Sequence, residues 1–409
     1  MKYRYLALST LALACSSAYA QSSVTLYGVL DLGFTYANNT QTARPASGPV
    51  GSSQFALSDG GTNGPAGTRW GMLVKEDLGG GLQAIATLEN GFSMSNGAAL
   101  QGGAMFGRQV FVGLTSPKWG TVTAGRQYDS YTDFVQPMAA VGQWAGYMGA
   151  MPDDVDSLGN TSRINNAVKF RTPSFDGFQA GGMYSFGGIA GQFTQNQVWA
   201  LGASYTGSTV TVAAGYINAR DPNVSLYGNV PGKGDETVNN LGSFGSAVSP
   251  QAYPVDSGYV SASTVQILGG GVQLAFHPVT VGAVVTNTRF EGLGTTSAPN
   301  PMQYTGTASF VNFELNLKTQ VTPEWMIGTA VHYTTRNSVN GDGGAKYMQA
   351  DLGTFYSLSK RTTLYALAVA QKATGRDSLG QPAVASISGF NPSATGRQVA
   401  VRLGVDHRF

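Results

Sequence analysis

The residues of this sequence that could act on other molecules are arginines and lysines that share one face of extended segments. In the stretch RINNAVKFR, apolar and polar residues alternate, and Arg163, Lys169 and Arg171 fall on the polar row. Arg69 and Lys75 have the same phase in an earlier segment. Guanidinium and ammonium groups aligned in this way attract and coordinate anions without making or breaking covalent bonds.

The other titratable residues form no recognisable catalytic or metal-binding set. General acid–base catalysis needs a positioned pair of groups, but the carboxylates on polar rows are far apart in the sequence: Asp31, Glu89, Glu314 and Asp351. The spacing of the histidines fits no metal site: they are His277, His332 and His407. The sequence therefore predicts no enzyme, no cofactor and no metal.

Residues 1–20, MKYRYLALSTLALACSSAYA, have the pattern of a secretory signal peptide. Lys2 and Arg4 precede an apolar core, and a small-x-small motif ends at Ala20, after which we expect cleavage. The single cysteine, Cys15, lies in this segment, so residues 21–409 are expected to form one domain without a disulfide. Lipidation of Cys15 is the alternative, but the preceding residues depart from the usual order of a lipoprotein site.

The composition of the remaining chain excludes two classes of protein. Removing Lys2 and Arg4 with the signal leaves 22 of the 24 basic residues against 22 acidic ones. A nucleic-acid partner is disfavoured because there is no basic excess to release counterions. No uninterrupted apolar run approaches the roughly 18 residues of a transmembrane helix, although only 11% of the residues are charged.

Alternation with a period of two recurs along almost the whole chain and predicts sixteen β-strands. They are expected near residues 24–36, 68–76, 82–92, 106–115, 119–127, 164–172, 178–186, 197–206, 209–217, 264–276, 279–290, 309–319, 325–335, 348–358, 362–371 and 398–409. The connections alternate between short turns and long segments rich in Gly, Ser, Asn and Pro; the long ones are 37–67, 93–105, 128–163, 187–196, 218–263, 291–308, 336–347 and 372–397. An up-and-down sheet with two different ends explains this alternation.

A sixteen-stranded sheet with one apolar face has to bury that face. At this strand number a closed barrel encloses water rather than a packed core, so we expect polar rows inside and apolar rows against lipid. Each backbone N–H or C=O group left unpaired in a bilayer costs several kcal/mol. Strands can therefore span a membrane only as a closed barrel. Segments of this length suffice to cross, and aromatic residues cluster near their ends, as in interfacial girdles.

The last segment, VRLGVDHRF, also alternates, although chain termini usually fray. We interpret it as the strand that pairs with the first and closes the sheet. Phe409 then lies on the outward row at the membrane interface, and this closing strand is expected to be read by the barrel-assembly machinery.

Several longer motifs carry a family resemblance: SSVTLYGVLDLGFTY, TRWGMLVKEDLGGGLQAIATLENGF, FGRQVFVGLTSPKWGTVTAGRQYD, PSFDGFQAGGMYSF and the terminal GVDHRF. Together they resemble the Gram-negative general porins, particularly those of beta-proteobacteria, over essentially the whole mature chain. The resemblance implies a homotrimer of sixteen-stranded barrels in the outer membrane, in contact with its lipid and lipopolysaccharide. It also implies a third loop folded into the lumen and passive diffusion of small hydrophilic solutes and ions.

Selectivity in such a pore depends on its width and on the charge at its narrowest point. The resemblance places Arg69, Arg108 and Arg163 on a basic wall, and strand phase adds Lys169. Arg126, at the start of the third loop, is a further candidate for this basic wall. The alternative interpretation is that a wet lumen simply tolerates charge.

The facing side of the constriction should come from the third loop, residues 128–163. Asp133 corresponds to an acid of the family pattern, and Asp129 is a nearby substitute. A second family acid is missing, because this chain has QPMAAVG there. Asp153, Asp154 and Asp156 are interpreted as solvated charges at the loop tip. The hypothesis is a mild preference for anions.

Other functions remain possible on the sequence. Segments 37–67 and 218–263 are long enough to bind a ligand, so a channel specific for a sugar or an organic acid is the main alternative. An outer-membrane enzyme is disfavoured because SNG at residues 95–97 has no histidine nearby. A soluble β-protein would expose its Trp, Phe and Leu rows to water.

Overall fold

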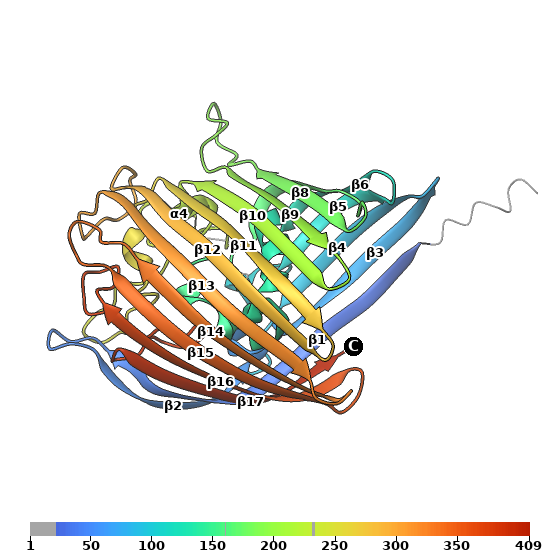
Figure 1. Ribbon diagram of the computed structural model, residues 1–409. Coiled ribbons are helices and arrows are strands. Elements are labelled where there is room, and N and C mark those ends of the chain that lie inside the picture. Colours follow the sequence, from blue (N-terminus) through green and yellow to red (C-terminus); the bar gives the residue numbers. More distant parts are fainter. Residues whose placement is uncertain (1–21, 160, 231–233) are drawn as a thin grey trace, which may run out of the picture.

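The chain forms one antiparallel sheet that closes on itself into a barrel (Figure 1). The computed structural model describes residues 22–159, 161–230 and 234–409, so the expected signal segment lies outside the described residues. Seventeen strands occupy sixteen positions around the barrel, because β2 and β3 pair in succession with β1. The strands are β1 (Ser23–Ala43), β2 (Val50–Asp59), β3 (Arg69–Gly79), β4 (Leu82–Gly91), β5 (Gln109–Ser116), β6 (Gly120–Gln127), β7 (Ile164–Arg171), β8 (Phe178–Ser185), β9 (Val198–Thr206), β10 (Val210–Arg220), β11 (Thr264–Phe276), β12 (Val279–Leu293), β13 (Gly306–Gln320), β14 (Trp325–Arg336), β15 (Ala345–Ser357), β16 (Thr362–Gly375) and β17 (Arg397–Arg408).

The helices are short, and most of them lie in the connection between β6 and β7, residues 128–163, which we call loop 3. They are α2 (Gly60–Asn63), η2 (Gln101–Gly103), α3 (Ser130–Val135), η3 (Gln136–Met138), η4 (Val141–Ala145), η5 (Tyr147–Gly149), η6 (Pro152–Asp154), α4 (Pro222–Ser225) and η7 (Ser257–Tyr259). Within the described ranges, none of these helices has the length and apolar character needed to span a bilayer.

The barrel closes where the sequence places the closure, between the last strand and the first. β17 pairs with β1 from Arg408 opposite Val29 to Ala400 opposite Ala37. Beyond this ladder, Phe409 and Gly28 exchange two backbone hydrogen bonds of 3.1 Å. The C-terminus and the start of β1 lie at the end of the barrel that carries the short turns (Figure 1). The expected closed barrel of sixteen positions is confirmed.

Residues 37–67 were expected to form a long loop, and for most of this segment the prediction was wrong. β1 continues to Ala43, and β2 runs back along it, with Asp59 opposite Leu32. The alternation is hidden because the outward row of β2 starts with Gly51 and Ser53 before its apolar residues begin. Beyond the apolar belt, two strands can pair without a row of apolar side chains. Hydrophobic periodicity alone therefore does not detect such strands.

The segment between β2 and β3, residues 60–68, turns into the barrel, and we call it the lumen insertion. The fully buried guanidinium of Arg402 holds it by donating to Asp31 Oδ1 at 2.9 Å and to Asn63 Oδ1 at 2.6 Å. Asp31 Oδ2 accepts the backbone N–H of Ala66 at 3.1 Å. A Cβ at Gly64 would overlap the Asp31 carboxylate, so only glycine fits this approach.

Part of the barrel interior is filled by an apolar cluster, which we call the inner core. Ile267, Phe290 and Phe310 point inward from β11, β12 and β13 and are fully buried. Tyr259 of loop 5 (residues 221–263) packs on the two phenylalanines with ring centroids 5.7 and 6.1 Å away. Leu158 of loop 3 belongs to the same cluster. The expectation of wetted inward rows throughout was therefore wrong for this side of the barrel.

Replacing Arg402 by methionine is expected to destabilise the barrel by about 3–5 kcal/mol, because the Asp31 carboxylate loses its buried partner. Urea unfolding in detergent micelles, followed by the mobility of unheated samples on gels, measures this. Arg408→Met is the matched control on the same strand: its side chain is 67% exposed, so its effect should stay below about 1 kcal/mol. Equal unfolding midpoints for the two variants would contradict the anchoring role of Arg402.

Candidate functional site

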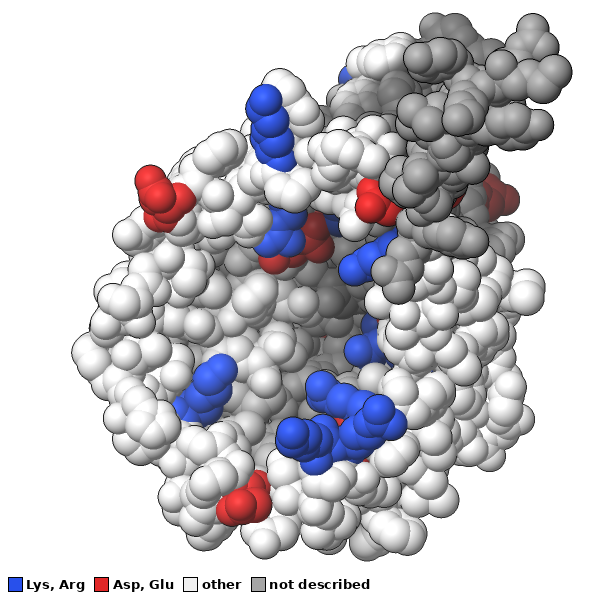
Figure 2. Space-filling view, turned by 90° about the vertical axis from the view of Figure 1, so that its right-hand side faces the viewer, with Lys and Arg blue, Asp and Glu red and all other residues white. Residues whose placement is uncertain are grey.

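A cavity of about 670 Å³ lies inside the barrel, on the side that the inner core leaves open. Its walls come from the lumen insertion, loops 3 and 5, the strand ends near β3, β5 and β7, and loop 8 (residues 376–396). Loop 3 touches the insertion directly, since the Tyr147 N–H donates to the carbonyl of Gly64 at 3.2 Å. The charged residues among the described lining are Arg69, Arg108, Asp153, Arg163 and Arg408. Figure 2 shows the hollow from the end with the short turns, with basic side chains around its wall.

Three of these arginines form one basic wall with a single carboxylate. Arg108 Nε lies 2.7 Å from Glu89 Oε1, and Arg69 Nε lies 3.3 Å from Glu89 Oε2. Tyr27 donates its hydroxyl to Glu89 at 2.8 Å. β3 and β4 bring these groups together, because Arg69 is opposite Gly91, two residues from Glu89. With Arg163, the wall has three positive charges and one negative charge.

Tyr128 joins the third arginine to this wall, and the sequence did not single it out. Its hydroxyl accepts from Arg108 Nη2 at 3.0 Å and from Arg163 Nη2 at 3.2 Å. The Arg163 guanidinium also lies 5.2 Å from the centre of the tyrosine ring. Burial favours the neutral hydroxyl, but Arg163 and Arg108 outweigh it and lower the pKa of Tyr128. An aromatic residue two places after Arg126 in GRQYD was the available signal.

Arg126 lies outside the residues that line the cavity. Its guanidinium donates to the carbonyls of Gly107, Arg163 and Asn229 at 2.9, 3.1 and 2.8 Å, and to the Asn165 side chain at 2.7 Å. The three carbonyls belong to three different connections of the barrel, and Asn165 lies in β7. The geometry is that of a tether between loops.

The two candidate loop acids do not face the basic wall. Asp133 pairs with Lys169 at 2.7 Å, and Lys169 also donates to the Tyr128 carbonyl at 2.9 Å. The charges of Asp133 and Lys169 therefore largely cancel each other. Asp129 is 2% exposed and caps α3, accepting the N–H and the hydroxyl of Thr132 at 2.8 and 2.9 Å.

The carboxylate that does reach the cavity is Asp153, at a junction of three loops. Its Oδ2 accepts the N–H of Val255 in loop 5 at 2.9 Å, and its Oδ1 accepts the hydroxyl of Ser386 in loop 8. The expectation that Asp153, Asp154 and Asp156 are solvated at the loop tip was wrong: Asp154 and Asp156 are 4% and 1% exposed. The loop tip folds into the lumen and packs there, so its acids are desolvated.

Burial shifts the titration of these loop acids. It raises the pKa of Asp154 to about 6 and that of Asp156 to about 7. It also raises the pKa of Asp153, which lies near Asp377 and Asp256, two other buried loop carboxyls. Near neutral pH, part of this acidic side is therefore uncharged.

Comparison with known proteins agrees with the fold. A sequence profile of the family described as Gram-negative porin matches residues 7–375 of the chain. The chain belongs to the Gram-negative porin family. An outer membrane porin protein of Bordetella pertussis is 29% identical to this porin over 435 residues, covering 100% of both chains. Outer membrane porin protein 32 of Delftia acidovorans is 36% identical over 197 residues, 46% of this chain and 50% of that protein.

Solved structures share the barrel. An anion-selective porin from Comamonas acidovorans has a TM-score of 0.67 at 20% identity and covers 95% of this chain and 100% of that chain. The trimer form of OmpT from Vibrio cholerae has a TM-score of 0.62 at 12% identity, covering 95% and 99%. At these identities the likeness concerns the fold. The family and the barrel place this porin in the bacterial outer membrane.

Raising the pH from 5 to 8 is expected to loosen the packing between loops 3, 5 and 8. The stabilisation from the protonated acids is complete below their ordinary pKa of about 3.9. It is lost as the pH rises through 6 to 7, where Asp154 and Asp156 ionise. Amide hydrogen exchange in loop 3, corrected for intrinsic rates, should be faster at pH 8 than at pH 5.

Asp156→Asn should flatten this pH dependence, because the amide cannot ionise. Asp235→Asn is the matched control, since Asp235 is an exposed carboxylate of loop 5. The same corrected protection at both pH values in the unmodified porin would contradict the prediction.

Proposed function

We propose that this porin forms a water-filled channel for the passive diffusion of small hydrophilic solutes and ions, with a mild preference for anions. The observation that carries the proposal is the basic wall of Arg69, Arg108 and Arg163, which shares one carboxylate, Glu89. A ring or wall of one charge at the narrow part of a pore raises the local concentration of counterions. Membership in the porin family supports the channel itself.

The charges of the loop acids opposite the basic wall support the preference for anions. Asp133 forms an ion pair with Lys169, and Asp129 caps the start of α3. Asp153 is the acid that reaches the cavity, and burial favours its neutral form. The solved anion-selective porin from Comamonas acidovorans has the same fold, which is consistent with this sign but does not set it.

A planar bilayer with a salt gradient tests the proposal. The reversal potential of the purified porin should have the sign of anion preference. Arg69→Gln combined with Arg163→Gln should move it towards zero, because Arg108 and Glu89 then compensate each other. Arg220→Gln combined with Arg289→Gln is the matched control: both residues lie on the outward rows of β10 and β12, and the same charge is removed outside the lumen.

Each outcome bears on a different part of the proposal. Absence of current from correctly folded protein would contradict the channel, whereas a cation-favouring sign would contradict the anion preference alone. A solute-specific channel is the second candidate, because loops 3, 5 and 8 and the lumen insertion all narrow the cavity. Concentration-dependent block by one sugar or organic acid would favour that alternative over general diffusion.

We also propose that three copies associate, as in the trimer form of OmpT. Small outward residues on β4, Ala84 and Ala86, are half-buried and allow close approach of a neighbouring barrel. Gly28 does not serve this purpose, because the ring of Phe409 covers it. The assembly machinery remains a proposed partner of the closing strand that ends at Phe409. Light scattering of the unheated protein–detergent complex should give the mass of three chains, and the mass of one chain would contradict the trimer.

A further inference from the structure

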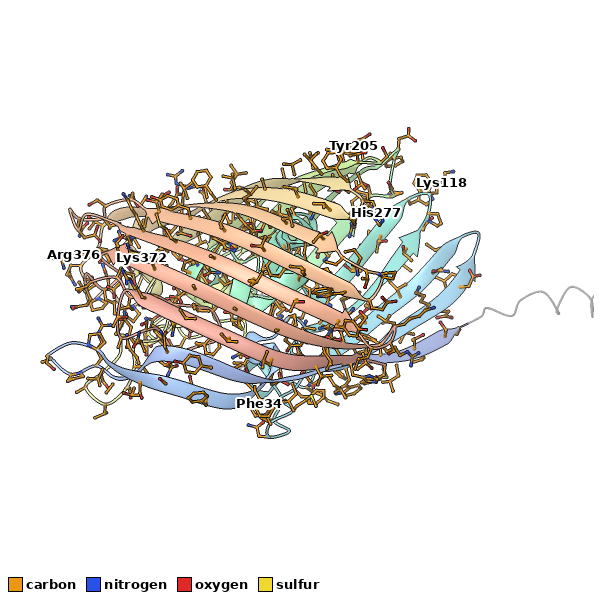
Figure 3. All side chains as sticks on the ribbon, turned by 60° about the horizontal axis from the view of Figure 1, so that its bottom comes forward. Phe34, Lys118, Tyr205, His277, Lys372 and Arg376 are labelled. Atoms are coloured by element: carbon orange, nitrogen blue, oxygen red, sulfur yellow. The ribbon has the colours of Figure 1, made fainter. Side chains whose placement is uncertain are left out.

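The cavity inside the barrel has an aromatic side as well as a basic wall. Tyr147 of loop 3, Tyr253 of loop 5 and Phe390 of loop 8 all contribute to its lining. Loop 8 starts at Arg376, at the end of the barrel with the long loops (Figure 3), and reaches back into the lumen to place Phe390 there. Three loops that are far apart in the sequence thus bring aromatic rings to one cavity.

Tyr253 has a backbone conformation that a bulky residue rarely adopts. Its φ is +53°, in the left-handed region. Its carbonyl accepts the N–H of Ser257 at 3.0 Å, which helps to hold the turn into η7. The side chain is nevertheless 44% exposed and lines the cavity. Strained residues cluster at ligand sites, and here the strain presents an aromatic ring to the lumen, which points to a use in binding.

The aromatic side lies close to the basic wall, because both contact the lumen insertion. Arg69 Nη1 donates to the Gly67 carbonyl at 2.8 Å, and the Tyr147 N–H donates to the Gly64 carbonyl at 3.2 Å. Gly64 and Gly67 are three residues apart, so their Cα atoms are at most about 11 Å apart. Both glycines line the cavity and have no side chain that would separate the two sides. One small molecule can therefore reach both of them.

We propose that this cavity binds aromatic monocarboxylates of the benzoate type, with the carboxylate on the basic wall and the ring against Tyr253 and Phe390. The inference rests on the proposed function and specifies the solute class of the same cavity. Guanidinium groups bind a carboxylate in a planar fork, and aromatic rings gain from contact with one another beyond the area that they bury. A volume of about 670 Å³ suits a small molecule. Both oxygens of Asp153, on the loop side, already accept hydrogen bonds, so a second carboxylate would find no partner there.

Block of the chloride current through the purified porin in a planar bilayer tests this site. Benzoate and cyclohexanecarboxylate have the same charge and similar bulk, but only benzoate has a planar aromatic ring. Benzoate should halve the chloride current at a concentration at least about fivefold lower than cyclohexanecarboxylate does. Equal block by the two acids, or block by neither, would overturn the inference and leave the diffusion channel standing. Absence of any current from folded protein would overturn both.

A double variant tests the two rings themselves. Tyr253→Leu combined with Phe390→Leu should abolish the difference between the two acids, because the contacts with the benzoate ring are lost. Tyr205→Leu is the matched control and should keep the difference, since Tyr205 is 46% exposed on the outer surface of the barrel (Figure 3). An undiminished difference in the double variant would overturn the assignment of these rings. The comparison of the two acids on the unmodified porin holds even if the double variant folds poorly.

Discussion

The structure depends on one constraint, that no backbone N–H or C=O may remain unpaired in the hydrocarbon layer. Closure between β1 and β17 satisfies it, and the two hydrogen bonds between Phe409 and Gly28 extend the ladder to the last residue of the chain. Because the closed sheet provides the rigid wall, segments inside the barrel are free to take irregular shapes. The lumen insertion and loops 3, 5 and 8 use that freedom.

The interior is divided into a filled side and an open side. On the filled side, the inner core packs Tyr259 of loop 5 and Leu158 of loop 3 against strand residues such as Phe290. On the open side, Tyr128 and Glu89 hold three arginines at the wall of the cavity. The packed side fixes where loop 3 lies, and the loop position decides which charges face the open side.

Alternation in the sequence was sufficient to predict the barrel, because lipid on one side and water on the other impose a strict period of two. Even the short β6 follows from it. β2 was missed because Gly51 and Ser53 replace apolar residues on its outward row. The inner core was missed because Phe290 and Phe310 add apolar residues to the inward face, near the ends of strands whose outward face is already apolar. Hydrophobic periodicity alone does not show which face of a strand packs against loops.

For the candidate site too, the sequence predicted the positions of residues near strands but not those of residues in loops. Arg69, Arg108 and Arg163 lie on or beside strands, and they line one cavity. Loop residues followed no such rule: Asp129 caps a helix, Asp133 pairs with Lys169, and Arg126 ties loops together. Their positions depend on contacts between segments far apart in the chain, such as the 2.9 Å bond from Val255 to Asp153, and no local pattern encodes these contacts.

Arg402 and Asp31 attach the lumen insertion to the barrel wall, whereas Glu89 and Tyr128 hold the arginines of the pore. Arg69 also donates to the Gly67 carbonyl of the insertion at 2.8 Å. Calibre and polarity are thus set by different parts of the molecule. A shorter insertion would widen the passage while leaving its electrical sign intact. Size cut-off and ion preference can consequently drift apart in evolution, and an engineer could adjust either one without rebuilding the other.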